Sequence, residues 1–145
     1  MTYKFYGWEH ADVGPIDETY ASIHNPRELY DLLSNIWSVS TCAPRLRSEW
    51  SEDNKTVGQC SITAFLAQEI FGGFVAGILR PGGNYHCFNV VGNCEFDLTS
   101  EQFGDEVLDY TNRLEQFREV HFSIEEKYVR YAHLKAELLK AIRKG

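Results

Sequence analysis

The stretch that decides the fold reads YHCFNVVGNCEFDLT and covers residues 85–99. Two runs of mainly β-branched and aromatic residues, 85–91 and 94–98, flank the pair Gly92-Asn93, and such runs are typical of strands. Glycine at the first of two loop positions favours a type II′ turn, which joins antiparallel strands. The stretch therefore predicts a tight antiparallel hairpin.

The register of this hairpin decides which side chains share a face. A two-residue turn places Val91 opposite Cys94, and side chains along a strand alternate between faces. His86 and Asp97 then become diagonal neighbours, with Cα atoms roughly 5–8 Å apart, so that an imidazole can reach a carboxylate. The opposite face is predicted to belong to the core and carries Cys87, Val91, Cys94, Phe96 and Leu98.

Upstream of the hairpin, residues 56–71 are predicted to form a helix. Thr56-Val57-Gly58-Gln59 has the spacing of a capping box, and Gly72-Gly73 marks the helix end. Cys60 then lies in the first turn, where unpaired backbone N–H groups and the helix dipole favour a thiolate. The backbone N–H of Cys60 and the side-chain amide of Gln59 are placed to donate to a developing oxyanion.

Cys60, His86 and Asp97 together fit the roles of a nucleophile, a base and an orienting acid. Cys60 would attack, His86 would take and return the proton, and Asp97 would fix the imidazole tautomer. Each residue also has a structural interpretation. Cys60 is then a small core residue, His86 a strand histidine bonded to Thr99, and Asp97 a turn acid. Their combination in one geometry favours the catalytic interpretation.

The remaining segments predict further helices and strands. Asn25-Pro26-Arg27-Glu28 has the pattern of a capped helix start, and this helix is expected to end near Trp37. Residues 74–79 and 117–122 are strand-like, and Ser123 is expected to cap a last helix. The positions predicted to lie on the inner face of that helix are Ile124, Tyr128, Tyr131, Leu134, Leu138 and Ile142.

These elements predict a single α+β domain over residues 25–145, with a helix flanking the core at each end. A chain of 145 residues suits one such domain. Residues 1–24 are aromatic and irregular and are expected to form an N-terminal arm. The sequence leaves open whether this arm covers Cys60.

Composition narrows the classes of partner and cofactor. The formal net charge of −7 argues against nucleic acid, because a phosphate backbone would be repelled. No apolar run is long enough to span a membrane and the first residues lack a secretion signal, so we expect no membrane partner and a cytoplasmic location. There the four cysteines should stay reduced. They lack CxxC pairs and no phosphate-binding glycine loop is present, so neither a metal nor another cofactor is expected.

Three segments carry a resemblance to a known family. GQCSITA, YHCFN and FDLTSEQF, over residues 58–64, 85–89 and 96–103, are similar to the bacterial YunG family, and the likeness extends over residues 26–125. The loop at 41–45 and Trp50 fit the same pattern.

The order of a cysteine, a strand histidine and Asp-Leu-Thr also resembles transglutaminase-like members of the papain-like superfamily. That resemblance implies a papain-like or transglutaminase-like fold, in which a helix carrying the cysteine packs on an antiparallel sheet. It assigns Cys60, His86 and Asp97 as the triad.

The expected function is cysteine-dependent acyl chemistry on an amide or ester, with a peptide or protein as substrate. Water as the second nucleophile gives a peptidase or amidase, whereas an amine gives a transferase, and the sequence leaves both open. Arg45 and Trp50 precede Cys60 in a loop that is expected to border the cleft. His121 is a second candidate base.

Two other functions remain open. One is a non-catalytic peptide-binding module on the same fold, and the other is a thiol redox sensor in which Cys42 resolves an oxidised Cys60. Loss of activity in His86→Ala would favour catalysis over binding. A Cys42–Cys60 disulfide after mild peroxide treatment would favour the sensor.

Overall fold

An antiparallel sheet of four strands forms the centre of the structure, a computed structural model that describes residues 2–144. The strand order is β3-β2-β1-β4. The strands are β1 (Phe74–Leu79), β2 (Tyr85–Val91), β3 (Cys94–Phe96) and β4 (Leu114–Gln116). The α-helices are α1 (Pro26–Leu33), α2 (Cys60–Phe71), α3 (Arg118–His121) and α4 (Glu125–Lys144). Short 3-10 helices are η1 (Trp8–His10), η2 (Glu18–Tyr20), η3 (Pro44–Glu49) and η4 (Ser100–Phe103). The fold is α+β, as predicted.

The hairpin of β2 and β3 has the predicted register. Val91 pairs with Cys94 and Asn89 with Phe96. Gly92 has φ +59° and Asn93 has a negative φ, as a type II′ turn requires. β3 ends at Phe96, two residues earlier than expected. Asp97 instead forms an isolated β-bridge with Tyr6 of the N-terminal segment, and the Tyr6 carbonyl accepts the Asp97 N–H at 3.0 Å.

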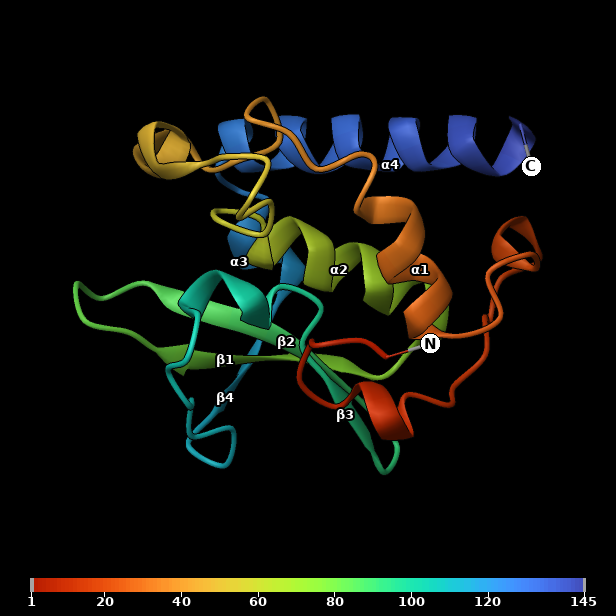
Figure 1. Ribbon diagram of the computed structural model, residues 1–145, viewed down its shortest axis with the longest axis horizontal. Helices are drawn as coiled ribbons and strands as arrows, with labels where there is room; N and C mark the ends of the chain where they lie inside the picture. The colour runs from red at the N-terminus through yellow and green to blue at the C-terminus, as the bar shows by residue number, and fades with distance from the viewer. Residues whose placement is uncertain (1, 145) are drawn as a thin grey trace.

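Helix α2 lies between the sheet and α4 (Figure 1). Most of its residues are buried, as expected for a helix that is apolar nearly all round. The helix begins at Cys60, so the capping box predicted at Thr56 was wrong. Gly58 has φ +72°, which is incompatible with a right-handed helix, and Gln59 is the N-cap. The predicted end is confirmed, since Gly72 has φ +84°.

The main core fills the space between the sheet and the helices. Its members from the hairpin include Cys87, Phe96 and Leu98, as predicted, and Val91 is a partly buried residue that packs against it. Cys94 was also predicted to lie in the core, but it is only partly buried and belongs to neither cluster, because it is the first residue after the exposed turn. A smaller cluster covers the other face of the sheet, where Phe88 and Val90 pack against Leu108 and Tyr110. The loop that carries Leu108 and Tyr110 therefore closes the face on which His86 lies.

Residues 2–24 are irregular but are part of the core. Phe5, Ala11, Tyr20 and Ile23 are almost fully buried in the main cluster. The expected arm is therefore a packed segment of the same structural unit.

Helix α1 has the predicted start and an earlier end. Asn25 Oδ1 accepts the Glu28 N–H at 3.1 Å, which confirms the cap. The helix ends at Leu33, and the chain then tightens into turns, in which the Asn35 and Ile36 N–H groups donate to the carbonyls three residues back rather than four.

The chain after residue 113 departs furthest from the prediction. The strand expected over 117–122 was wrong, because these residues form the single helical turn α3 with its two caps. A short strand, β4, lies just before them and pairs with β1. Phe122, which ends this turn, packs edge-on against Phe65 of α2. This tertiary contact outweighs the local strand pattern.

Helix α4 begins two residues after Ser123, whose Oγ donates to the Val120 carbonyl rather than capping the helix. Tyr131, Leu134 and Leu138 are buried as predicted, but Ile124 and Tyr128 at its first turn are exposed. The first turn extends past the core and borders a cavity instead.

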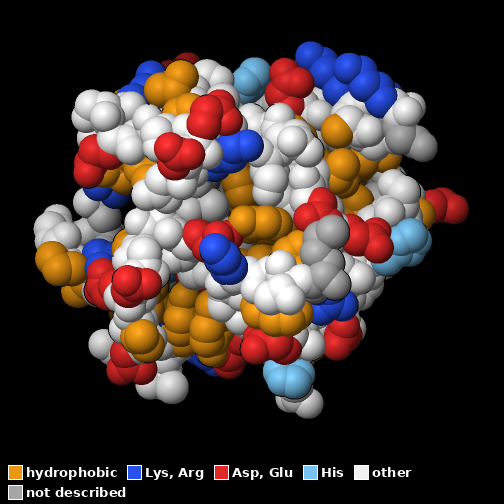
Figure 2. Space-filling model, in the orientation of Figure 1, with side chains coloured by type: hydrophobic (Ala, Val, Ile, Leu, Met, Phe, Trp, Pro, Cys, Tyr) orange, Lys and Arg blue, Asp and Glu red, His pale blue; other side chains and the backbone are white. Residues whose placement is uncertain are grey.

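Acidic and basic side chains are interspersed over the face seen in Figure 2, and several Lys and Arg side chains gather near the C-terminal end of α4. Within residues 2–144, no helix combines the length and the apolar character needed to cross a bilayer.

Candidate active site

Cys60 is the first residue of α2 and is partly exposed. The helical hydrogen bonding starts with Thr63, whose N–H donates to the Gln59 carbonyl at 3.1 Å. The N–H groups of the first turn, including that of Cys60, are therefore not used by the helix and point outward from its positive end. Cys60 Sγ lies 3.9 Å from the Tyr85 carbonyl oxygen, beside the start of β2.

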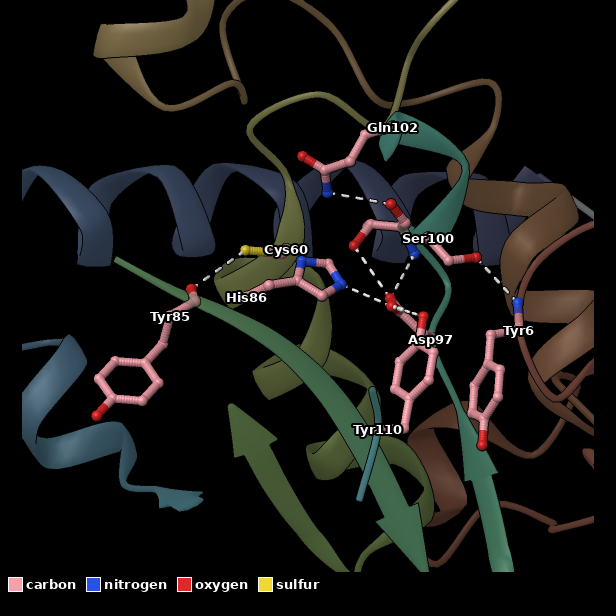
Figure 3. A network of polar contacts seen from close by, with 9 residues as sticks. Tyr6, Cys60, Tyr85, His86, Asp97, Ser100, Gln102 and Tyr110 are labelled. Carbon is pink, nitrogen blue, oxygen red and sulfur yellow. Dashed lines mark hydrogen bonds and ion pairs between the residues drawn. The ribbon is translucent and has the colours of Figure 1, made fainter. Parts of the chain in front are cut away.

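His86 lies between Cys60 and Asp97 (Figure 3). Its side chain is 2 % exposed, and Nε2 is 2.6 Å from Asp97 Oδ2. Nδ1 is buried and has no hydrogen-bond partner within residues 2–144. The ring thus uses one nitrogen for Asp97 and turns the other toward the Cys60 sulfur, as the alternation of the strand predicts for the His86–Asp97 pair.

Asp97 is fully buried, and its carboxylate is held by four contacts. Besides His86, it accepts the Tyr110 hydroxyl at 2.7 Å, the Thr99 N–H at 3.2 Å and the Thr99 hydroxyl at 3.3 Å. A buried carboxylate needs such donors to replace its lost hydration. These donors fix the carboxylate, and the carboxylate in turn fixes the His86 ring.

The surroundings shift the pKa values of Cys60 and His86 in opposite directions. A hydrogen bond from the Cys87 thiol and the charge and hydrogen bond of His86 hold the pKa of Cys60 well below its ordinary value of 9.0, although burial opposes this. Burial lowers the pKa of His86, but Asp97 and Cys60 outweigh it and raise that pKa to about 10. The two shifts favour a thiolate–imidazolium pair at neutral pH.

Cys87 was assigned to the core and is buried there, but it also contacts Cys60. Because α2 begins beside β2, the Cys60 sulfur meets residues from both sides of that strand. The shared hydrogen bond and burial raise the pKa of Cys87 well above 9.0, so Cys87 stays a neutral thiol donor. Cys42 is also buried, which raises its pKa, and its sulfur lies against the backbone of Ala43 and Gly58.

A cavity of about 810 Å³ opens beside Cys60 and His86. Its walls come from η3, the β1–β2 turn, η4 and the start of α4, and every lining residue lies between Ala43 and Arg130. The N-terminal segment therefore lies behind Asp97 and does not line the approach to Cys60. The apolar part of the wall includes Pro44, Leu46, Val57, Phe103, Val120 and Ile124.

The other predicted site residues have different places. Arg45 lines the cavity, whereas Trp50 packs within its own loop and donates its Nε1–H to the Lys55 carbonyl at 2.9 Å. Gln59 is fully buried and its Nε2 donates to the Ser38 carbonyl at 3.1 Å. One amide hydrogen of Gln59 is thus already used, and its role as an oxyanion donor stays a prediction.

His121 lies at the same cavity but in a different electrostatic setting. Burial and the neighbouring Lys127 lower its pKa to about 4, so the ring is neutral near pH 7. Its Nδ1 is 3.0 Å from Lys127 Nζ. Nδ1 of His121 is therefore already in contact with a lysine, whereas Nδ1 of His86 is free to face Cys60.

Two residues of the site carry no local signal in the sequence. Tyr110, which binds Asp97, comes from a long loop that crosses the sheet. Phe103 packs edge-on against the His86 ring at 4.7 Å, and Arg80 lies over Phe103 at 4.7 Å. Phe103 lies in the FDLTSEQF segment, so the family resemblance marked its neighbourhood without giving its role.

Part of the chain is similar in sequence to a bacterial protein. The uncharacterized protein YunG of Bacillus subtilis (strain 168) is 38% identical over 56 residues, which cover 39% of this chain and 48% of the relative. The aligned part thus spans about half the length of that relative. No solved structure matches the chain. The family described as YunG protein matches residues 25–143, most of the chain. The chain therefore belongs to the YunG family.

Proposed function

We propose that this protein is a cysteine-dependent acyl-transfer enzyme that acts on an amide or ester, with Cys60 as nucleophile. The observation that carries the proposal is the arrangement of His86, with Nε2 2.6 Å from a buried Asp97 carboxylate and Nδ1 free beside Cys60. A histidine held in this way can keep Cys60 ionised and return a proton to a leaving group.

In the first step the Cys60 thiolate adds to the substrate carbonyl carbon, and the electron pair of the C=O bond moves onto oxygen. The backbone N–H of Cys60, at the positive end of α2, is placed to stabilise that oxyanion. Collapse of the intermediate breaks the bond to the amine or alcohol, which takes the proton of His86 Nδ1. The product is a thioester on Cys60.

In the second step water or an amine attacks the thioester while neutral His86 Nδ1 accepts its proton. The C–S bond breaks, the acyl group leaves with the new nucleophile, and the thiolate–imidazolium pair is restored. Water makes the protein a hydrolase and an amine makes it a transferase. Asp97 is a positioning residue throughout, because it holds the ring and stabilises its positive charge.

We further infer a papain-like or transglutaminase-like arrangement of this site. It is supported by a cysteine at the start of a helix, α2, that packs on an antiparallel sheet carrying His86, with Asp97 directly after the adjacent strand. The open cavity beside Cys60 is large enough for part of a peptide.

Acylation by an activated ester tests the proposal. Wild-type protein mixed with p-nitrophenyl acetate is expected to release p-nitrophenolate and to carry an acetyl group on Cys60, located by peptide mass spectrometry. Cys60→Ala and His86→Ala should show neither, while Cys94→Ala should behave as wild type, because Cys94 is a partly exposed cysteine outside the site.

Acetylation that spares Cys60, or that persists in folded His86→Ala, would overturn the proposal. Circular dichroism of each variant shows that loss of reaction is not loss of fold.

A further inference from the structure

The cavity beside Cys60 carries more positive than negative charge, although the whole chain has a net charge of −7. Its charged lining residues are Arg45, Arg80, Lys127, Arg130, Glu49 and Glu126. In a chain that is acidic on balance, a cationic cavity attracts a negatively charged ligand.

Two of these cations are already neutralised by carboxylates. Arg130 is paired with Glu126, and Arg80 Nη2 lies 2.8 Å from Glu106 Oε1. Neither Arg45 nor Lys127 forms an ion pair within the part of the chain that the structure describes. Arg45 and Lys127 are therefore the two cations available to a ligand, and Glu49 is the one lining carboxylate that no cation pairs among the described residues.

Lys127 is held in place by a neutral histidine. An ammonium group can only donate, so His121 Nδ1 accepts from Lys127 Nζ at 3.0 Å, and the proton of the ring lies on Nε2. Nε2 in turn donates to Gln116 Oε1 at 2.9 Å. All three residues line the cavity. This chain of contacts orients a lysine without neutralising it, and leaves two ammonium hydrogens for another acceptor.

The cavity also has an apolar wall, since Val120 and Ile124 line it and are 66% and 52% exposed. A ligand that fits both parts has an anionic group and an apolar portion.

We propose that the acyl substrate carries a carboxylate, as an acidic peptide does, and that Lys127 and Arg45 bind this carboxylate while the scissile carbonyl meets Cys60. The proposal rests on the proposed function, because it assigns the substrate class of the same site. Lys127 and Arg45 are specificity-determining residues in this account.

The relative rates of two alkylating agents at Cys60 test the charge of the cavity without a known substrate. Iodoacetate is anionic and iodoacetamide is neutral, and both attack the same thiolate. The ratio of their rate constants is therefore independent of the thiolate fraction and reports the charge that surrounds the sulfur. The ratio is measured by peptide mass spectrometry at Cys60 and, as an internal reference, at Cys94.

Lys127→Gln and Arg45→Gln are each expected to lower the iodoacetate-to-iodoacetamide ratio at Cys60 about threefold, the effect of one unit charge over roughly 7 Å of water. The double variant should lower it about tenfold. Lys140→Gln is the matched control, because it removes a lysine from the same helix α4 but outside the cavity, and it should leave the ratio unchanged. Arg45 is exposed, so its replacement does not disturb the core.

An unchanged ratio in the double variant would overturn the proposal, as would an equal fall in Lys140→Gln. Failure of this inference and failure of the proposed function are distinguishable. The first leaves acetylation of Cys60 by the neutral ester intact, whereas the second abolishes that acetylation whatever the ratio.

Discussion

His86 Nε2 lies 2.6 Å from Asp97 Oδ2, and this contact determines what the other ring nitrogen can do. With Nε2 engaged, Nδ1 is left free beside Cys60. The same carboxylate accepts hydrogen bonds from Tyr110 and Thr99, so the ring orientation is fixed by segments far apart in the sequence. The site is thus built around Asp97 as much as around Cys60.

The hydroxyl of Tyr110 is predicted to contribute to stability through this carboxylate. Tyr110→Phe keeps the ring that stacks on Tyr6 but removes the 2.7 Å hydrogen bond to Asp97. Because the lost bond is to a buried charged group, we expect the free energy of unfolding to fall by about 1.5–3 kcal/mol in urea titrations. Tyr6→Phe is the control, since the Tyr6 hydroxyl forms no hydrogen bond among residues 2–144. Equal effects of the two substitutions would contradict this role for Tyr110.

The pairing of Cys60 with His86 predicts an unusual pH dependence of stability. Unfolded His86 loses its proton near 6.5, whereas in the folded protein its pKa is about 10. This raised pKa alone would make stability fall as pH rises from 6.5 toward 10. The lowered pKa of Cys60 has the opposite effect below its unfolded value of 9.0, because the folded protein has then already lost the thiol proton. Between pH 6.5 and 8.5 the two effects therefore oppose each other in the wild type.

Cys60→Ser removes the effect of Cys60 and leaves that of His86. Asp97, which contributes more than Cys60 to the raised pKa of His86, is still present. The variant is therefore expected to lose stability with rising pH over that range, with a slope steeper than wild type by up to about 1.4 kcal/mol per pH unit. Urea unfolding at several pH values measures both slopes, and groups common to the two proteins drop out of the difference. Identical slopes would show that Cys60 and His86 do not form an ion pair.

The conformation of the loop that precedes α2 is predicted to require glycine at position 58. A Cβ atom there would lie 2.5 Å from Cys42 Sγ and 2.9 Å from the Ala43 nitrogen, and the residue has φ +72°. Gly58→Ala should therefore destabilise the protein through both strain and a clash. Gly82→Ala is the matched control, since Gly82 also has positive φ but no atom lies within 4 Å of its Cβ position. We expect Gly58→Ala to cost at least about 1 kcal/mol more than Gly82→Ala in thermal or urea unfolding.

The parts of the structure that could be predicted from the sequence are those set by local geometry. Gly92-Asn93 defines the turn, and the turn defines the register that brings His86 to Asp97. Cys60 in the first turn of a helix was also predicted, although its start was misplaced. The start was misplaced because Thr56 has the spacing of a cap, whereas the backbone at Gly58 is set by its close approach to Cys42.

The rest of the site depends on contacts between distant segments. Nothing near Tyr110 in the sequence indicates that its loop crosses the sheet to reach Asp97, and Tyr6 reaches Asp97 from more than half the chain away. Cys87 was assigned to the core from strand alternation, which is correct, but alternation gives no information on how α2 begins beside the same strand. Such positions follow from packing rather than from periodicity.

The central claim, that His86 keeps Cys60 ionised for nucleophilic attack, is tested most directly by the pH dependence of iodoacetamide alkylation at Cys60. The rate is followed site by site by mass spectrometry in wild type, His86→Ala and Asp97→Asn, with Cys94 in each protein as the reference thiol. In wild type the pH midpoint of Cys60 alkylation should lie well below the ordinary thiol pKa of 9.0, and His86→Ala should lose this reactivity at low pH. Asp97→Asn should shift the midpoint upward. A Cys60 that titrates like an ordinary thiol in wild type, or that is unaffected by loss of His86, would contradict the account.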